Sequence, residues 1–512
     1  MRGLNLRLRR KSSAQVEAQP VSVVELEGFN VIDEYWIYEP YAKVKIVGDL
    51  RTGGFSYFID EVQLNDWERR VLERIVDVLS WELEPPSEGV VSRDYVVSEA
   101  RRVIKRYGFK ADRFFGKILY YVERDFLGFG PLDPLMRDSM IEDISVNGVG
   151  LPIYIWHRRY ESMPTNIVFN DQLFLDNLVL KLAHFARKHV SVAFPILDAM
   201  LPGQHRLAAT FKAEVSPKGS SFTIRKFRAE PFSITELIEL GTLDEFIASY
   251  LWFMIDNRAT LMIIGGTGSG KTSFLNSVVS LIQPHLKIVT VEEIPELQLP
   301  RTNWVQLVSR ESYGLGASRI GSVSLFDLVK VSLRYRPDYI IIGEVRGEEA
   351  FVLFQAMATG HGGMCTMHAE NLSYAIKRLT GPPMNVSPVY IPLMNIVVQV
   401  ERVRLPKPSG PTKFGRRVRH VWEIAAYEDY LEVFSWNPIH DVFNAANLGG
   451  SCILRNISVK TGVPIEELID ELERRRSFLK LLIQKGVRRN EDVVREILRY
   501  HVEIGGGRWL RV

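Results

Sequence analysis

The stretch "LMIIGGTGSGKTSFLNSV", Leu261 to Val278, decides how the chain folds. Its apolar start predicts a buried strand, and the apolar residues that follow Lys271 recur with the period of an α-helix. The turn between them matches G-x-x-x-x-G-K-[S/T], the phosphate-binding loop or P-loop. Because this pattern needs a strand before it and a helix after it, the stretch predicts a site for a nucleoside triphosphate.

Each residue type in the loop has a physical reason. Glycines let the backbone wrap closely around phosphates and aim N–H groups at them, at the positive end of the following helix. Lys271 is expected to reach the β and γ phosphates of ATP, and the Thr272 hydroxyl is expected to bind Mg²⁺. The predicted nucleotide contacts are Gly265, Gly266, Thr267, Gly268, Ser269, Gly270, Lys271, Thr272 and Ser273.

A nucleotide site of this kind also needs a strand that leads to a carboxylate. In "DYIIIGEVRG" the apolar run ends just before Glu344, which we predict polarises the attacking water. Many P-loop proteins carry an aspartate at the preceding position, here Gly343, so another carboxylate is expected to help with magnesium. The candidates are Glu292 and Glu293 in "VTVEEIPELQLP", with Glu293 holding Mg²⁺ directly or through a water. Acids are common in loops, so either can instead be an ordinary loop residue.

Two histidines flank a short apolar strand in "TGHGGMCTMHA", Thr359 to Ala369. A strand of this kind can place His368 near the γ-phosphate as a hydrogen-bond donor, and His361 is the second candidate. A lone histidine is more often a packed or exposed side chain, but two of them beside glycines favour a role in the site. Cys365 and these histidines do not have a recognisable zinc-ligand spacing.

The length of 512 residues predicts two or three domains. Strand-like alternation followed by helical periods predicts a small α+β domain over residues 1–108, which includes a basic N-terminal arm, and a second over residues 109–230. From residue 231 to 512, helices alternate with short apolar strands, which is typical of a parallel sheet flanked by helices. Roughly the last 60 residues show the helical period.

Charge and composition limit the partners. The formal net charge is +3, and no basic stripe interleaved with aromatic residues is found, so nucleic acid is not an expected partner. No apolar run approaches the ~20 residues of a membrane span. The basic arm "MRGLNLRLRRKSS" and the basic stretch Glu401 to His420 are expected to be solvated; contact with an acidic partner or anionic lipid is the alternative. Two cysteines cannot build a disulfide framework, which indicates a reducing compartment.

The boxes "GGTGSGKT", "VTVEEIPELQL", "RYRPDYIIIGEVRG" and "TGHGGMCTMHA", in this order, resemble the signature boxes of the type II/IV secretion ATPases. This family includes the hexameric motors of type II secretion, type IV pili, type IV secretion and the archaellum. Weaker resemblance extends back through "GFGPLDPL", "LPGQHRLAAT" and "GSSFTIRKF". The resemblance implies an α/β fold with a C-terminal RecA-like core, a preceding PAS-like α+β domain, and ATP and Mg²⁺ as cofactors.

The resemblance also implies further site residues and partners. Family members reach phosphates with arginines of the domain before the P-loop, often across a subunit boundary, and the matching residues are Arg206 and Arg225. Arg334, Arg336 and Arg346 are weaker candidates, since they can pair with neighbouring acids. The family further implies a homo-hexamer at the cytoplasmic face of the membrane, in peripheral contact with it and with a polytopic inner-membrane platform protein.

Three classes of function are weighed. The first is a cytoplasmic ring ATPase that powers protein secretion or pilus-like filament assembly, with the archaellum motor as the alternative within the family. The second is a RecA-like nucleic-acid motor. The third is a nucleotide-gated scaffold with negligible turnover, which needs no water-positioning Glu344. The chain resembles the archaeal branch of the family in three respects: it has no C-x-x-C insert, its N-terminal region is long, and it contains "IRKF".

Overall fold

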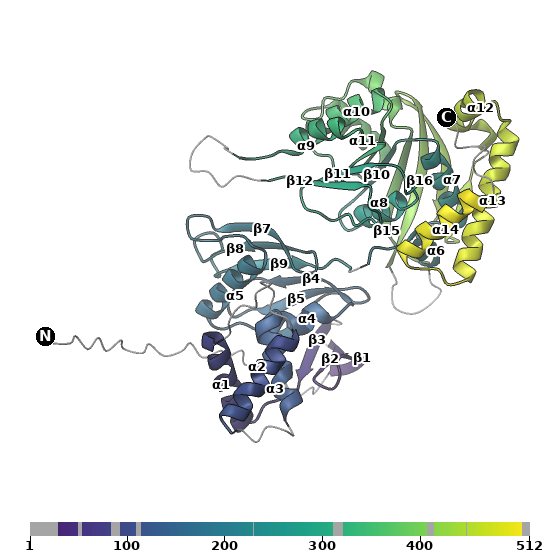
Figure 1. Cartoon of the computed structure of the whole chain (residues 1–512). Helices are drawn as coiled ribbons and strands as arrows, with labels where there is room; N and C mark the ends of the chain where they lie inside the picture. The colour runs from purple at the N-terminus through teal and green to yellow at the C-terminus, as the bar shows by residue number, and fades with distance from the viewer. Residues whose placement is uncertain are drawn as a thin grey trace. The chain divides into compact units, whose positions relative to one another are not determined.

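The computed structural model describes residues 29–49, 54–82, 93–108, 114–228, 230–310, 321–406, 414–446 and 448–503 (Figure 1). The basic N-terminal arm lies outside these residues. The chain divides into two compact units, Met1–Phe227 and Arg228–Val512, and each is described by itself. None of the helices in the described ranges combines the length and the apolar composition that crossing a bilayer requires.

The first unit is built on a mixed sheet in the order β1-β2-β3-β6-β5-β4-β9-β8-β7. The strands are β1 (Phe29–Tyr38), β2 (Ala42–Asp49), β3 (Phe55–Glu61), β4 (Ile141–Val146), β5 (Pro152–His157), β6 (Glu161–Val168), β7 (Ile196–Leu201), β8 (His205–Thr210) and β9 (Ser221–Arg225). The helices are α1 (Asp66–Glu82), α2 (Arg93–Arg106), α3 (Phe115–Val122), α4 (Asp133–Arg137) and α5 (Gln172–Phe185). Apolar residues of α5 pack on the sheet, whereas α1 to α3 share a separate apolar cluster.

An asparagine side chain helps to join the two parts of this sheet. The antiparallel strands β1 to β3 meet β6 through one parallel pair, Tyr57 and Thr165. Beside that pair, the Ile59 N–H donates to Asn166 Oδ1 and Asn166 Nδ2 donates to the Ile59 carbonyl, both at 2.9 Å. The sheet therefore continues across residue 108, and the domain boundary expected there stays a prediction.

The second unit contains a sheet in the order β12-β11-β13-β14-β10-β15-β16-β17-β18. Strands β12 through β15 in this order are paired in parallel, and the strands from β15 to β18 are antiparallel. The strands are β10 (Leu261–Gly265), β11 (Ile288–Glu292), β12 (Trp304–Val308), β13 (Tyr339–Ile342), β14 (Gly362–His368), β15 (Ile396–Arg404), β16 (Phe414–Ala426), β17 (Asp429–Asn437) and β18 (Val442–Ala445). The predicted α/β class with a parallel-sheet core is confirmed.

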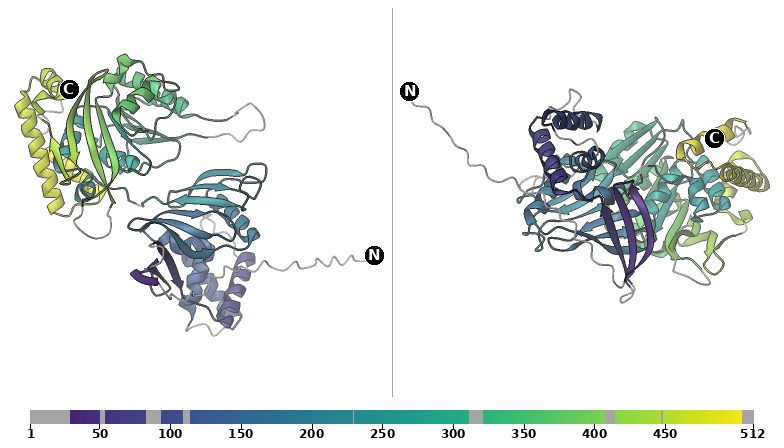
Figure 2. Two further views of the ribbon diagram at one scale, coloured as in Figure 1. Left: turned by 180° about the vertical axis from the view of Figure 1, so that it is seen from behind. Right: turned by 90° about the horizontal axis from the view of Figure 1, so that it is seen from below.

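Helices cover both faces of this sheet (Figures 1 and 2). Along β10, Leu261 and Ile263 pack in the cluster of α7, α8, α13 and α14, whereas Met262 and Ile264 pack in the cluster of α9 to α11. Burial on both faces explains why these strands are continuously apolar. The helices are α6 (Ile234–Glu239), α7 (Glu245–Asp256), α8 (Lys271–Val279), α9 (Leu325–Ser332), α10 (Glu349–Ala358), α11 (Leu372–Thr380), α12 (Cys452–Thr461), α13 (Ile465–Gln484) and α14 (Asn490–Glu503).

A buried ion network ties the C-terminal helices to the core. The Arg475 side chain on α13 is 1% exposed, and it donates to Asp256 Oδ2 at 2.5 Å and to Glu471 Oε1 at 2.9 Å. Asp256 is the last residue of α7, five residues before β10 begins. Strand β10 leads into the P-loop, so α13 is bound to the element that precedes this loop.

Candidate nucleotide site

The P-loop joins β10, which ends at Gly265, to α8, which begins at Lys271. Gly268 and Gly270 have φ angles of 71° and 90°, in the left-handed region that favours glycine. A Cβ at Gly265 would lie 2.2 Å from the Val400 carbonyl, so a larger residue does not fit there. Gly270 is the N-cap residue of α8 and offers no side chain to its first N–H groups. The helix therefore begins with N–H donors suited to an anion.

Lys271 is folded back onto its own loop. Its ammonium donates to the carbonyl oxygens of Gly265 and Gly266 at 3.0 and 2.8 Å, and it lies 3.4 Å from Nε2 of His368. Burial lowers the pKa of Lys271 to about 8, although the nearby Glu344 carboxylate opposes this effect. Phosphate oxygens would offer this desolvated cation a stronger partner than neutral carbonyls, so the loop fits a polyphosphate.

Glu344 lies two residues beyond β13 with one oxygen engaged and one without a partner. Its Oε2 accepts a hydrogen bond from Arg346 at 2.7 Å. Its Oε1 is buried and has no hydrogen-bond partner within the described ranges. Burial would raise the pKa of Glu344, but the hydrogen bond and charge of Arg346, with His368 and Lys271, lower it overall. An ionised carboxylate with an unsatisfied oxygen can accept a hydrogen bond from a water.

Glu292 has a different environment at the end of β11. Its Oε1 accepts the N–H groups of Glu296 and Leu297, both at 2.9 Å, and its Oε2 accepts the Gln306 amide at 3.1 Å. Burial raises the pKa of Glu292 to about 7. One oxygen holds the following loop and the other holds the neighbouring strand β12, so the geometry makes Glu292 a positioning residue. Its support of metal or water stays a prediction. A Cβ at Gly343 would lie 3.1 Å from Glu292 Cγ, so a side chain there would have to displace Glu292.

Arg346 connects two of the predicted acids. It donates to Glu344, and its Nη1 lies 3.5 Å from Oε2 of the half-exposed Glu293. The backbone N–H groups of Arg346 and Gly347 donate to Glu349 Oε1 at 2.6 and 2.7 Å, which fixes the loop. The sequence reasoning missed Glu349, although an acid in the first turn of a helix is a recognisable signal.

Arg334 and Arg336 are placed away from this cluster. Both precede β13, whereas Glu344 follows it, so the strand separates them from the P-loop edge of the sheet. The structure therefore brings Arg346 to the site and leaves these two arginines at the other edge.

The two predicted histidines lie at opposite ends of β14. The parallel register pairs His368 with Gly265, which places His368 beside the P-loop. Burial and the charge of Lys271 lower the pKa of His368. His361 precedes β14 and contacts Thr359 Oγ1 at 3.0 Å. The strand between them is about 20 Å long. Of the two candidate histidines, only His368 lies next to the loop of its own chain, and a role for His361 stays a prediction.

Arg206 and Arg225 belong to the first unit. They are direct partners in the antiparallel register of β8 and β9, so they share one face of the sheet. Arg206 pairs with Asp198 at 2.7 Å, and Arg225 pairs with Asp143 at 3.0 Å. The structure brings these arginines together, and their contact with phosphates stays a prediction.

The residues around the loop fit a magnesium held mainly by phosphate and water. Thr272 lies in the first turn of α8 and is partly buried. In the part of the chain that is described, no three histidine, cysteine or acidic side chains gather as a metal cluster. Mg²⁺ commonly takes only one or two protein ligands beside phosphate oxygens and waters. The Thr272 hydroxyl can supply one such ligand, and a contribution from Glu293 stays a prediction.

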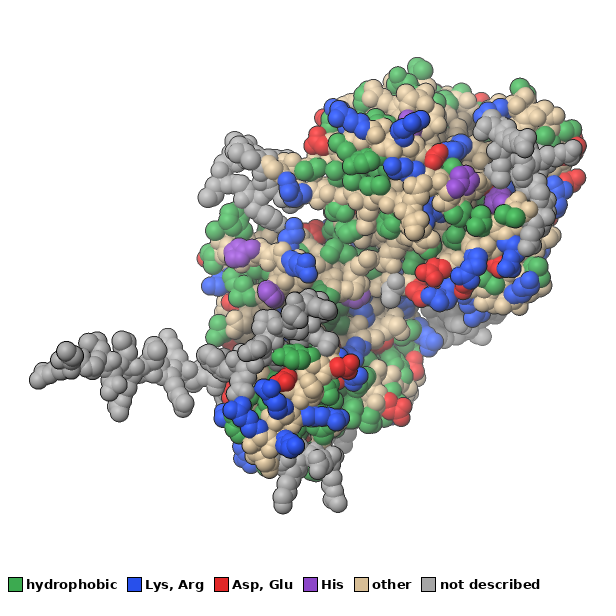
Figure 3. Space-filling model, viewed as in Figure 1, with side chains coloured by type: hydrophobic (Ala, Val, Ile, Leu, Met, Phe, Trp, Pro, Cys, Tyr) green, Lys and Arg blue, Asp and Glu red, His purple; other side chains and the backbone are tan. Residues whose placement is uncertain are grey.

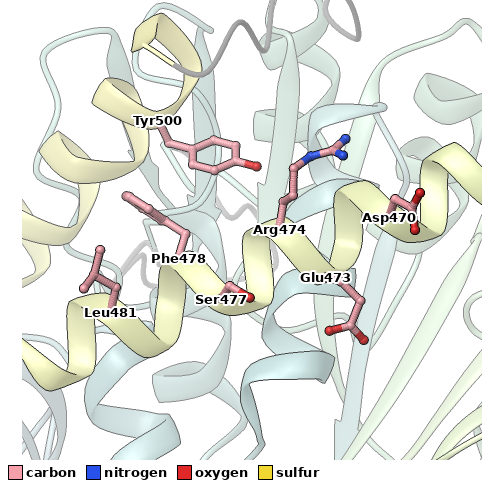
Figure 4. Close-up of a pocket in the computed structure, with 7 residues that line it drawn as sticks. All are labelled: Asp470, Glu473, Arg474, Ser477, Phe478, Leu481 and Tyr500. Atoms are coloured by element: carbon pink, nitrogen blue, oxygen red, sulfur yellow. The ribbon is translucent and has the colours of Figure 1, made fainter.

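A groove between α13 and α14 is separate from this site. It has a volume of about 610 Å³ and contains none of the predicted site residues. Tyr500 of α14 faces Phe478 of α13 there, with ring centroids 4.9 Å apart (Figure 4).

Figure 3 shows basic and acidic side chains interspersed on one face, without a continuous basic stripe in that view.

A parallel sheet whose glycine-rich loop opens at a helix N-terminus defines a P-loop protein of the nucleotide-binding class. The family described as "Type II/IV secretion system protein" matches residues 126–405, more than half of the chain. The protein therefore belongs to the type II/IV secretion system protein family. Members of this family are ATPases that bind nucleotide.

Several known proteins are similar to the chain. The uncharacterized protein MJ0900 of Methanocaldococcus jannaschii is 38% identical over 381 residues, which cover 72% of this chain and 67% of that protein. The type IV secretion system protein PtlH of Bordetella pertussis is 30% identical over 276 residues, 49% of this chain and 78% of that protein. The conjugal transfer protein TrbB of Rhizobium radiobacter is 32% identical over 257 residues, 48% of this chain and 73% of that protein.

Among solved structures, the pilus retraction motor PilT with bound ADP has 17% identity and a TM-score of 0.39. The match covers 67% of this chain and 90% of that one. The VirB11 ATPase of the Brucella suis type IV secretion system has 24% identity and a TM-score of 0.28, with 57% and 92% covered.

Proposed function

We propose that the protein is a Mg²⁺-dependent ATPase that converts hydrolysis into domain motion and so powers protein secretion or the assembly of a type IV pilus-like filament. It acts as a homo-hexamer at the cytoplasmic face of the membrane, on a polytopic platform protein. One observation carries the proposal: Lys271, Glu344 and His368 meet at the carboxyl ends of three adjacent parallel strands. The names of the relatives, type IV secretion and conjugal transfer, support secretion as the process that ATP hydrolysis powers.

The side chains divide the chemistry between them. The loop N–H groups and Lys271 bind and orient the phosphates, and Lys271 exchanges its two carbonyl partners for phosphate oxygens. Thr272 and Glu293 would hold Mg²⁺, which would neutralise charge on the phosphates. Glu344 uses its unpartnered oxygen to orient the attacking water and to accept its proton. His368, beside Lys271, donates a hydrogen bond to the terminal phosphate.

Motion follows from where the arginines lie. Arg206 and Arg225 are on the first unit, whereas the P-loop is on the second. A phosphate that attracts these guanidinium groups, in the same or a neighbouring subunit, draws the two units together, and loss of the terminal phosphate releases them. To reach a phosphate, each arginine would leave its aspartate partner. It would return to that aspartate when the phosphate is lost, so the exchange of ion pairs is reversible.

The test measures phosphate release and nucleotide binding separately. Glu344→Gln should retain binding and lose at least about a hundredfold in turnover, since it removes the general base. Lys271→Ala should lose binding. Glu348→Gln is the matched control because Glu348 is an exposed acid in the same loop. Unchanged turnover in Glu344→Gln would refute the assigned chemistry and favour a scaffold.

The motor is tested by assembly and by stimulation. Nucleotide should promote a hexamer, measured by mass in solution, and anionic vesicles or membranes should stimulate turnover. Stimulation by single-stranded DNA instead, with salt-sensitive binding, would favour a nucleic-acid motor.

A further inference from the structure

The hairpin of β15 and β16 places two arginines opposite each other. In the antiparallel register, Arg402 pairs directly with Arg416. Directly opposite residues point to the same face of a sheet, where like charges destabilise the pairing. The Arg402 guanidinium also lies over the Phe414 ring, 4.7 Å from its centroid, which holds the side chain on that face. Two guanidinium groups therefore lie on one face of this hairpin.

The same hairpin forms one wall of the P-loop. Strand β15 runs parallel to β10, and its Val400 carbonyl lies against Gly265. From β16, Arg416 Nε donates to the Gly268 carbonyl at 3.4 Å. The Arg416 Cδ atom would lie 2.9 Å from a Cβ at Gly270. Arg416 is thus in contact with the glycines that surround the predicted phosphates, and Arg402 lies opposite it on the hairpin.

We propose that Arg416, supported by Arg402, is an additional cationic contact for the polyphosphate of a nucleoside di- or triphosphate bound in the P-loop. This inference rests on the proposed function and adds residues outside the sequence motif.

Strand β16 itself provides a matched control. Arg419 is on the same strand as Arg416, but it pairs with Glu401 at 3.8 Å and lies over the Trp436 ring, away from the loop. Arg419→Gln removes the same charge from the hairpin as Arg416→Gln does. The two variants therefore separate a contact with the ligand from a general change in charge.

The experiment is calorimetric titration of the full chain with Mg²⁺-free ADP at several salt concentrations. Arg416→Gln should bind ADP at least about tenfold more weakly, the effect of one lost charge-assisted hydrogen bond. Its affinity should also depend less on salt, because one cation–phosphate contact is missing. Arg416→Lys should recover part of the affinity and the salt dependence. Arg402→Gln should have a smaller effect of the same sign, and Arg419→Gln should match the wild type.

The outcomes separate this inference from the proposed function. If the wild type binds ADP and Arg416→Gln binds it equally well with the same salt dependence, the inference is overturned while the proposed function stands. If the wild type binds no ADP, the proposed function itself is overturned. If thermal unfolding shows that Arg416→Gln does not fold, Arg416→Lys becomes the deciding variant. Affinity for ADP that stays low, with little dependence on salt, would mean that residue 416 supports folding alone and would overturn the inference. Affinity and salt dependence close to those of the wild type would support it.

Discussion

Binding of nucleotide should be accompanied by uptake of a proton on Lys271 in alkaline solution. In the ligand-free protein, burial lowers the pKa of this lysine to about 8 from its ordinary 10.5. Phosphate oxygens favour the charged ammonium and so return the pKa toward the ordinary value or above it. Above pH 8 the free protein holds a largely neutral lysine and the complex a charged one, so a proton must enter from solution.

The expected size follows from the two pKa values. At pH 9 about 0.9 of the free protein has a neutral lysine, against about 0.03 of the complex, so ADP binding should take up about 0.9 proton. At pH 7 the uptake on this group should be only about 0.1 proton. By linkage, the affinity for ADP should fall roughly sixfold per pH unit between about pH 8 and 10.

Calorimetric titration in buffers of different ionisation enthalpy measures the number of protons directly. Mg²⁺-free ADP is suitable because its terminal phosphate, with a pKa near 6, is fully ionised above pH 8. Lys271→Arg is the control, since its guanidinium stays charged and should remove the uptake even where it weakens binding. An uptake at pH 9 as small as that at pH 7, or one retained in Lys271→Arg, would refute the reasoning.

Three further results are expected from buried groups. Arg475→Met removes the arginine that bridges the buried Asp256 and Glu471 carboxylates and should lower the free energy of unfolding by about 3–5 kcal/mol in denaturant titrations; an unchanged midpoint would contradict the network. Gly265→Ala brings a Cβ within 2.2 Å of the Val400 carbonyl and should abolish ADP binding with unchanged circular dichroism, whereas retained affinity would show that the loop can shift. Because burial raises the pKa of Glu292 to about 7, the native state binds more protons than the unfolded chain below that pH. As the pH rises from about 5 to 8, the Tm of Glu292→Gln should therefore rise relative to the Tm of the wild type. A difference in Tm that does not change with pH would argue against this assignment.

The core of the fold is predictable because its signals are local. Strands β10, β11, β13 and β14 are apolar on both faces, so each is a continuous apolar run between turns. The edge strand β12, Trp304–Val308, escapes prediction because it is only partly buried. The continuation of the first sheet from β3 to β6 also escapes prediction, since it depends on residues more than a hundred positions apart.

The candidate site divides in the same way. Lys271, Glu344 and His368 are recognisable because each follows or ends a strand in a short motif. Arg416 contacts a loop 148 residues before it, and nothing in the local sequence indicates which strand lies beside the P-loop. The position of His361 is equally non-local, since the direction and length of β14 decide which end meets the nucleotide.

Asn166 gives the first unit an unusual seam. Its amide offers an N–H donor and a carbonyl acceptor, as a peptide unit does, and it satisfies both backbone polar groups of Ile59. The connection between β3 and β6 therefore depends on one residue pair and one side-chain amide, while the apolar core beneath it is continuous across both parts of the sheet.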